Sequence, residues 1–524
     1  MVDEIELKLM LPPGAAAGIA RQPAFRRLIG QQTSDRVQRK RLDSVYFDTS
    51  EKWLAERGMA LRVRRIGKKR IQTLKAPLAG PDGLQSFREY ETEIIGEKPL
   101  LSSVNDLGLR RRLERAKIWD QLKPVFSTRF DRSSFLAERD GSSIEVAVDH
   151  GEISADSKRK PIAEIELELK SGDAGDLFDL AAELTEGLSE EIHIRLGHET
   201  KAQRGFALAE GASPKPHKAS PIVLKADATT ADAFAAIARN CLAQLRANEA
   251  AVLAIEDDEA IHQFRVAIRR LRAIVGAYRD LIDDDMHAML SIDLRWLQRQ
   301  FGSARDLDVL IAETLVPLNQ RLHRQLSLDP LIEIAEAARI EARREARLAL
   351  ENPRYAAMLI ALYRRLHTSD WQRLSAGARL GAPVRSFATS LLQGRHKRLA
   401  KLGSRSATLP ETELHRLRLL GKKMRYGAEA FSSLYKPKTA RKYVLALAVI
   451  QDRLGSLNDA FVSRHVLLNL VRRLVMERDM PAAEAALLHG TVLGWQTARI
   501  ERDLADFPEA WSDFAKCRKF WSER

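Results

Sequence analysis

The feature that most constrains this chain is a set of short segments in which charged and apolar side chains alternate residue by residue. One lies at positions 4–9 (EIELKL), and the pattern returns at 164–170 (EIELELK). Successive side chains of a β-strand point to opposite faces, so each segment is predicted to be a strand with one charged and one apolar face. For a single strand, a sheet with water on its charged side explains the same pattern.

Several other segments repeat this alternation. Arg62 and Arg64 alternate with apolar neighbours, an acidic row lies at 89–93, and Glu145 shares a strand face with Asp149. Acidic and cationic side chains on facing strands favour a barrel with a charged, hydrated lumen that binds an anion together with a metal ion. The alternative for part of this lumen is a purely structural network of ion pairs.

A change in composition divides the chain. Residues 1–208 contain short strand-like runs and two helical pieces around 15–29 and 176–187. Residues 209–221 form a linker, in which 211–221 carries three prolines. Residues 222–515 are rich in Ala, Leu and Arg and show helical periodicity. The predicted fold class is α+β, with an N-terminal antiparallel β domain followed by an all-α domain.

The positive charge of the chain is concentrated in its helical part. Residues 1–210 hold 35 Lys and Arg against 35 Asp and Glu, so the net charge of +14 lies entirely beyond them. A basic half beside a neutral half implies an anionic partner for the basic half. Two cysteines, the lack of a leader segment and the lack of a long apolar run predict a cytoplasmic protein without a membrane partner.

The helical part contains an internal repeat. One copy reads H-x2-R-x3-RR-x-R from His262, and the other reads H-x2-R-x3-KK-x-R from His415, 153 positions later. A second pair of blocks, at 298–306 and 451–459, has the same offset. Two matches at one offset predict a duplicated pair of helical bundles, at about 222–370 and 371–515.

Each copy places a basic stripe on one helix face. At about 100° per residue, His262, Arg265, Arg269 and Arg272 fall within an arc of about 80°. A solvated cationic face explains one such helix, but we expect neither stripe to have acidic partners at i,i+4. Two stripes in one cleft would attract a polyanion, and the histidines either contact that anion or are half-buried helix residues. The candidate residues are His262, Arg265, Arg269, Arg270, Arg272, His415, Arg418, Lys422, Lys423 and Arg425.

At these motifs the chain resembles two known families. Residues 1 to about 208 resemble a CYTH domain, the triphosphate tunnel fold, through Glu4-x-Glu6-x-Lys8, YFDT at 46–49, LRVR at 61–64, TLK at 73–75, the acidic row at 89–93, AEIE at 163–166 and KAQRG at 201–205. Residues from about 222 to 515 resemble a CHAD domain through the two histidine blocks. The fused pair resembles bacterial inorganic triphosphatases of the CYTH–CHAD arrangement.

The resemblance implies an eight-stranded antiparallel tunnel that binds a triphosphate with Mg²⁺ or Mn²⁺. It assigns metal binding to Glu4, Glu6, Asp149, Glu164 and Glu166, with Glu168 on the same face. It assigns phosphate binding to Lys8, Arg62, Arg64, Lys75, Arg129, Lys201 and Arg204, and a catalytic role to Glu4, Glu6, Lys8, Arg62, Arg64 and Lys75. For the helical part it implies binding of inorganic polyphosphate.

These expectations predict a metal-dependent enzyme that hydrolyses inorganic triphosphate to phosphate and pyrophosphate, with a helical domain that binds polyphosphate. One alternative is a different activity of the same fold: adenylate cyclase, thiamine triphosphatase or nucleoside triphosphatase. Another alternative is a polyphosphate-binding scaffold without catalysis. Nucleic acid is a weaker candidate partner, because only 6% of the residues are aromatic and no base-stacking surface is evident.

Overall fold

The computed structural model describes residues 2–30, 37–78, 83–188, 192–254, 258–322, 325–368, 377–405 and 409–522. The chain divides into two compact units, and each is described by itself. The first unit comprises Met1–Pro214 together with Leu350–Ser369, and the second comprises Lys215–Ala349 together with Asp370–Arg524. We call them the tunnel unit and the helical unit.

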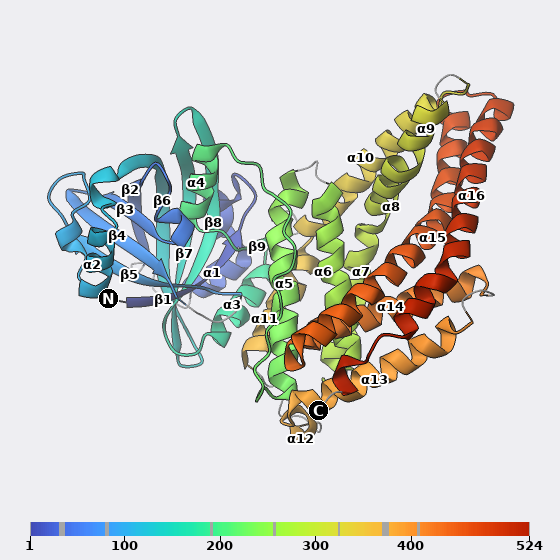
Figure 1. The fold of residues 1–524 in the computed structure, drawn as a ribbon. Helices are drawn as coiled ribbons and strands as arrows, with labels where there is room; N and C mark the ends of the chain where they lie inside the picture. The colour runs from blue at the N-terminus through green and yellow to red at the C-terminus, as the bar shows by residue number, and fades with distance from the viewer. Residues whose placement is uncertain are drawn as a thin grey trace. The chain divides into compact units, whose positions relative to one another are not determined.

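The tunnel unit is built around one antiparallel sheet whose order is β5-β4-β3-β2-β6-β7-β8-β1-β9, with an additional pairing of β5 with β1. That pairing closes eight strands into a ring, which leaves β9 as an extra strand on β1 (Figure 1). The strands are β1 (Val2–Met10), β2 (Gln38–Asp48), β3 (Ala60–Ile66), β4 (Lys69–Pro77), β5 (Gln85–Glu93), β6 (Lys123–Arg139), β7 (Ser142–Ala155), β8 (Lys158–Ser171) and β9 (Arg195–Gly197). The predicted eight-stranded antiparallel tunnel is confirmed.

The strand register explains how charged side chains come together in the lumen. Lys8 of β1 lies opposite Glu166 of β8, and Asp149 of β7 lies opposite Glu164 of β8. Arg132 of β6 lies in turn opposite Asp149. Because side chains directly across a pair of strands share a face, these registers place the charges of four strands on one side of the sheet.

The other face of β1 and β8 is not exposed to water. Leu7, Leu9, Ile165 and Leu167 are all fully buried. Helix α3 (Gly175–Glu186) packs on both strands. The apolar half of the alternation therefore forms a core beneath α3, while the charged half lines the lumen.

Helix α4 (Lys201–Glu210) packs against β6, β7 and β8. A capping box starts it, in which the side chain of Thr200 accepts from the backbone N–H of Gln203 and the Gln203 side chain accepts from the N–H of Thr200. Phe206 of this helix meets the ring of Phe126 edge-on, with ring centroids 5.0 Å apart. These contacts fix the helix so that its first turn, which carries Lys201 and Arg204, is buried.

The remaining helices of the tunnel unit are α1 (Pro23–Gly30), α2 (Leu107–Arg115) and α11 (Pro353–Thr368). The helical piece expected at 15–29 is a 3-10 helix at Ala15–Arg21 followed by α1. The two pieces meet at Pro23, which lacks the N–H that a continuous helix would need.

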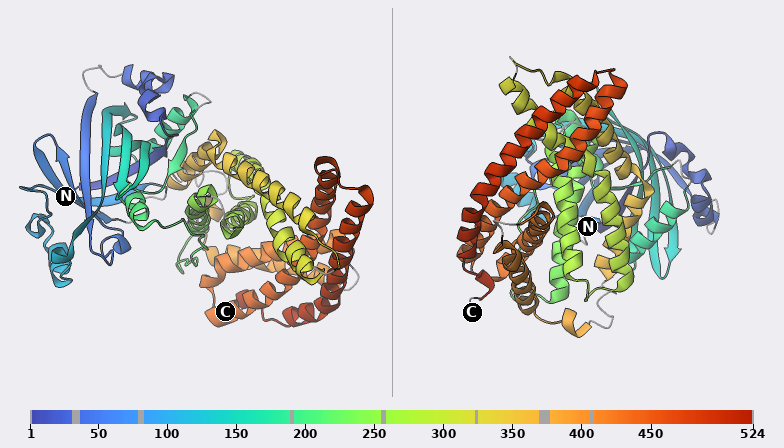
Figure 2. Two further views of the ribbon diagram at one scale, coloured as in Figure 1. Left: turned by 90° about the horizontal axis from the view of Figure 1, so that it is seen from above. Right: turned by 90° about the vertical axis from the view of Figure 1, so that its right-hand side faces the viewer.

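The helical unit consists of helices from residue 230 onward, as Figures 1 and 2 show. They are α5 (Thr230–Ala254), α6 (Asp258–Ala277), α7 (Asp284–Gln300), α8 (Gly302–Leu310), α9 (Val316–Leu322), α10 (Asp329–Glu351), α12 (Gly377–Leu380), α13 (Val384–Gly403), α14 (Glu411–Phe431), α15 (Pro437–Glu477) and α16 (Ala482–Ala515). The predicted all-α character is confirmed. Within the described ranges, no helix combines the length and the apolar character that crossing a membrane requires.

The two copies of the repeat differ at the second pair of matching blocks. Gly302 starts α8 after a break at Phe301, whereas the equivalent Gly455 lies inside the uninterrupted helix α15. At the break, Arg265 donates a hydrogen bond of 2.5 Å to the carbonyl oxygen of Phe301. A basic side chain of the first copy thus satisfies a carbonyl at a helix end. The predicted domain boundaries at 208, 221, 370 and 515 stay a prediction.

Candidate functional site

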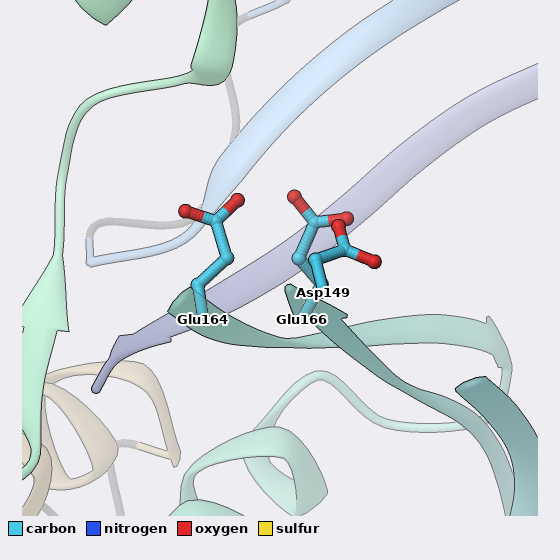
Figure 3. Close-up of side chains that lie close together, drawn as sticks. All are labelled: Asp149, Glu164 and Glu166. Atoms are coloured by element: carbon cyan, nitrogen blue, oxygen red, sulfur yellow. The ribbon is translucent and has the colours of Figure 1, made fainter. Parts of the chain in front are cut away.

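Three carboxylates form a compact group inside the tunnel. Asp149 on β7 and Glu164 and Glu166 on β8 each offer an oxygen, and these oxygens lie within 4.8 Å of one another. Figure 3 shows the three side chains rising from the same side of their strands. Asp149 and Glu164 are fully buried, and Glu166 is 8% exposed. We call these residues the acidic trio.

Cationic side chains surround the acidic trio. The Lys201 ammonium lies 2.6 Å from Asp149 and 2.9 Å from Glu166, and it also contacts Glu164. Arg132 donates two hydrogen bonds, of 2.7 and 2.6 Å, to the Asp149 carboxylate and a third to Glu166. Burial alone would raise the pKa of Glu166, but Lys201, Lys8 and Arg132 hold it well below its usual value. Glu166 is therefore kept ionised.

A second acidic group lies along β1. Lys8 contacts Glu6 and Glu166 at 2.6 Å each, so it links this group to the trio. Lys75 on β4 contacts Glu4 at 2.5 Å and Glu89 at 2.6 Å. Burial raises the pKa of Glu6, only partly offset by Lys8. Glu4 and Glu6 thus share the lumen with the trio and have lysines as their immediate partners.

Two arginines of β3 differ in their surroundings. Burial opposes the charge of Arg62, but Tyr46 and Glu89 raise its pKa above the ordinary value. Arg64 donates a hydrogen bond of 3.2 Å from Nε to the hydroxyl of Ser44. Among the described residues, it has no carboxylate at ion-pair distance. Burial, followed by the charge of Arg62, lowers the pKa of Arg64 to about 9. Arg64 is a buried cation that an anion in the lumen would stabilise.

The acidic row of β5 also reaches the lumen, in part. Glu89 forms an ion pair with Lys75. Glu91 accepts a hydrogen bond of 2.9 Å from the hydroxyl of Thr73, and its carboxylate lies 4.0 Å from the guanidinium of Arg62. Glu93 instead pairs with the exposed Lys69 at 3.0 Å.

The structure brings most of the predicted tunnel residues together, with one exception. The Arg129 side chain is 64% exposed and pairs with Asp43 at 3.0 Å, so it does not face the lumen. Arg132, which sequence reasoning missed, is the arginine of β6 that reaches the trio, with a side chain 19% exposed. One signal could have found it: Arg132 has the same strand parity as the buried Phe130, and Arg129 has the opposite parity.

Two other residues complete this comparison. Arg204, which was predicted to bind phosphate, contacts Glu164 of the acidic trio and therefore lies in the lumen. Glu168 shares the strand face of the trio but lies apart from it, paired with Lys170 at 2.6 Å.

The donor set fits a hard divalent cation. Three buried carboxylates that converge from two adjacent strands are the ligand type that Mg²⁺ and Mn²⁺ prefer. The ammonium of Lys201 contacts all three carboxylates in this structure. Asp149, Glu164 and Glu166 could hold a metal ion in its place.

The helical unit contains a large basic cleft with a cavity volume of about 1310 Å³. Both predicted stripes contribute to its lining, from α6 and from α14. The stripe residues that line it are His262, Arg265, Arg269, Arg270, His415, Arg418, Lys422 and Arg425. Arg305, Arg441 and Arg499 line it as well, although sequence reasoning did not select them.

Burial lowers the pKa of four stripe residues in this cleft: His262, Arg265, Arg418 and Lys422. The pKa of Lys422 falls to about 6, because burial and then the charges of Arg418 and Arg269 disfavour its protonated form. The pKa of His262 falls to about 4 through burial and the charge of Arg305. Positive charges crowded so closely would be stabilised by a bound polyanion.

The structure adds detail on four residues of the predicted stripes. Arg425 has an acidic i,i+4 partner, Glu429, at 2.8 Å, so the expectation that neither stripe would have one is wrong. Arg272 donates to Gln298 and is not part of the cavity lining. Lys423 also lies outside the lining. His415 contacts Asn458 at 2.7 Å, which orients its ring.

Three of the proteins that resemble this chain differ in how much of it they cover. An inorganic triphosphatase of Haemophilus influenzae is 35% identical over 209 residues, which is 40% of this chain and 55% of the length of that relative. An uncharacterized protein of Mycobacterium tuberculosis is 26% identical over 469 residues, 85% of each chain. The crystal structure of the CHAD domain from the plant Ricinus communis is 30% identical, covers 57% of this chain and 96% of that one, and has a TM-score of 0.48.

Two protein families match this chain, one after the other along the sequence. The description of the CYTH domain matches residues 3–206. The description of the CHAD domain matches residues 236–468. The two matches fall on the sheet with its charged lumen and on the helices with their basic cleft. The chain therefore belongs to the proteins that join an N-terminal CYTH domain to a C-terminal CHAD domain.

Proposed function

We propose that the tunnel hydrolyses inorganic triphosphate to phosphate and pyrophosphate with a divalent metal ion, Mg²⁺ or Mn²⁺. The observation that carries this proposal is the acidic trio, three carboxylates within 4.8 Å, inside a lumen that also contains buried arginine and lysine side chains. A polyphosphate and a divalent cation are complementary to these two sets of charges. The relative named inorganic triphosphatase supports the same substrate class.

Binding would exchange one set of ion pairs for another. In the structure Lys8, Lys75, Arg132 and Lys201 neutralise carboxylates of the lumen. A triphosphate would give these cations phosphate oxygens as partners, and a divalent ion would neutralise the carboxylates. Each of these four cations and its carboxylate partners would keep an opposite charge, so the cost of removing them from water would not arise again on binding.

The reaction needs charge neutralisation and alignment more than covalent chemistry. The oxygen of a water molecule forms a bond to the terminal phosphorus, the anhydride P–O bond breaks, and pyrophosphate leaves. Arg132 offers a planar fork that grips two oxygens at once, and Lys8 and Lys75 act as point charges on the phosphates that are not transferred. Arg64, which donates a hydrogen bond to the hydroxyl of Ser44, would gain a charged partner. A bound metal ion would supply further charge neutralisation at the transferred phosphoryl group.

A substrate panel tests this proposal. Purified full-length protein is incubated with Mg²⁺ or Mn²⁺ and with tripolyphosphate, ATP or thiamine triphosphate, and phosphate, pyrophosphate and cyclic AMP are quantified. We expect phosphate and pyrophosphate in equal amounts from tripolyphosphate. Cyclic AMP from ATP, with tripolyphosphate unchanged, would replace the proposal with an adenylate cyclase. Binding of tripolyphosphate without any turnover would favour the scaffold alternative.

We further propose that the basic cleft of the helical unit binds inorganic polyphosphate. The cavity of about 1310 Å³ is lined by basic residues of both repeats, and burial has already reduced the hydration of several. Competition between polyphosphate and RNA for the full-length protein, over a series of salt concentrations, tests this proposal. Near-equal displacement by both would indicate a non-specific cationic surface.

We also propose that the protein works in a reducing compartment such as the cytoplasm, where thiols stay unpaired. Cys241 and Cys517 are free thiols in the structure. Burial raises the pKa of Cys241 to about 11, which makes it a poor nucleophile.

A further inference from the structure

Helix α11 belongs to the tunnel unit although it lies inside the CHAD match in sequence. The compact unit that contains the barrel includes Leu350–Ser369, about 140 residues beyond the end of its first segment at Pro214. The CHAD description covers residues 236–468, so it includes this helix. One part of the barrel unit is therefore supplied by the helical half of the sequence.

The packing of α11 is that of a core element. Its residues Tyr355, Leu359, Leu362 and Leu366 follow a helical stripe and are all buried. The helix packs on α3 and on β9, as Figure 1 shows for α3. Burial of large apolar side chains along one face is the main source of stability for a helix that packs in this way.

Aromatic contacts fix this helix on α3. The ring of Tyr363 stacks on that of Phe178, with centroids 6.2 Å apart and an interplanar angle of 14°. Tyr363 also lies against Gly83, where a Cβ atom would come within 2.5 Å of the ring. Gly83 has φ of +83°, so both its conformation and its missing side chain suit this position.

Polar contacts fix the orientation of α11. Arg364 donates to Asp179 of α3 through Nε and through Nη2, the latter at 3.0 Å. His367 lies 3.7 Å from Asp173, just before α3. A paired fork between guanidinium and carboxylate has a preferred geometry, so it selects one rotation of the helix.

The elements beneath α11 contact the strands that carry lumen residues. Strand β9 pairs with β1 through Lys8, Leu9 and Met10. Helix α3 packs on β1 and β8, whose opposite face carries Glu6 and Lys8 on β1 and the trio residues of β8. A displacement of α11 would reach the wall of the lumen through one layer of packed side chains.

We propose that α11 is a positioning element of the tunnel, through which the helical half of the chain holds the β1–β8 wall in place. This inference rests on the proposed function only for the expected change in kcat, since the packing role of α11 does not depend on which reaction the tunnel performs. In this proposal α11 acts on the barrel and not on the substrate directly. Turnover of triphosphate therefore depends on residues 353–368.

Charge reversal in the full-length protein tests this proposal. The variants are Arg364→Asp, Asp179→Arg and the double exchange, with Arg364→Gln as a milder change. Hydrogen exchange of the amides at 7–10 and 195–197 is measured, together with kcat and KM for tripolyphosphate with Mg²⁺. Because a partly exposed ion pair is broken, we expect exchange at these amides to rise about two- to fivefold in each single variant, with recovery in the double exchange. We expect kcat to fall more than KM changes.

A matched control removes an ion pair elsewhere. Arg279 pairs with Asp284 at 2.6 Å within the helical unit, so Arg279→Asp should leave exchange at 7–10 and 195–197 unchanged. Wild-type exchange in Arg364→Asp and Arg364→Gln would overturn the proposal, as would single variants that the double exchange does not rescue. If the wild-type protein hydrolyses no triphosphate, the proposed function fails, and the exchange data still decide the role of α11.

Discussion

Replacing Glu166 by glutamine tests the role of the acidic trio most directly. The side chain keeps its shape, but the lumen loses one negative charge that three cations share: Lys8 at 2.6 Å, Lys201 at 2.9 Å and Arg132. If the trio holds the metal ion, the loss of one ligand should reduce hydrolysis of tripolyphosphate by about 100-fold or more, since even the partners of metal ligands are worth about 10- to 100-fold.

The stability cost of Glu166→Gln can be bounded from the contacts. Removing one partner of an isolated buried ion pair costs about 3–5 kcal/mol, because the other charge is left alone. Here Lys8 keeps Glu6 at 2.6 Å, and Lys201 and Arg132 both keep Asp149 at 2.6 Å. We therefore expect a smaller loss in the free energy of unfolding, about 1–3 kcal/mol. For a unit of this size, each kcal/mol lowers the midpoint of thermal unfolding by about 2–4 °C.

The same strand offers a matched control. Glu168 lies two residues further along the same face, with a side chain 21% exposed and paired with Lys170 at 2.6 Å. Glu168→Gln should change stability by less than about 1 kcal/mol and leave most of the activity intact. The assay is release of phosphate and pyrophosphate at several Mg²⁺ concentrations, with circular dichroism to verify folding. Near-wild-type hydrolysis by Glu166→Gln, or an equal loss in Glu168→Gln, would refute the assignment of the trio.

Three further predictions concern the arginine fork, the metal ion and pH. Arg132→Lys keeps the charge but loses the fork on Asp149, so we expect KM for tripolyphosphate to rise about tenfold, whereas Arg129→Lys on the exposed face should behave as wild type. Treatment with EDTA should abolish hydrolysis, added Mg²⁺ should restore it, and Mg²⁺ should raise the unfolding temperature of the wild type more than that of Glu166→Gln. The pKa of Lys422 is about 6, so this residue is mostly neutral at pH 8 and gains its charge as the pH falls through 6. Polyphosphate affinity measured by calorimetry should therefore rise from pH 8 to pH 5.5, by at most about tenfold for each pH unit between 8 and 6, and Lys422→Arg should flatten this dependence. A pH profile that is identical in wild type and Lys422→Arg would contradict that reasoning.

The alternating strands, the helical repeat and the charged residue types of the tunnel could be predicted from spacing along the chain. These features are local, because strand alternation and helical periodicity depend only on spacing along the chain. Residues 4–8 and 164–166 therefore identified two walls of the lumen, and His262 and His415 identified the helices that line the basic cleft.

Which charged side chains contact one another depends on how the strands and helices pack. The choice between Arg129 and Arg132 depends on the register of β6 against β7, where Arg132 lies opposite Asp149, and a shift by one residue would exchange their faces. The placement of Lys201 among three carboxylates depends on how α4 packs against the barrel. The inclusion of α11 in the tunnel unit joins residues far apart in sequence. Such contacts follow from burial of apolar faces and closure of the sheet, which spacing along the chain does not encode.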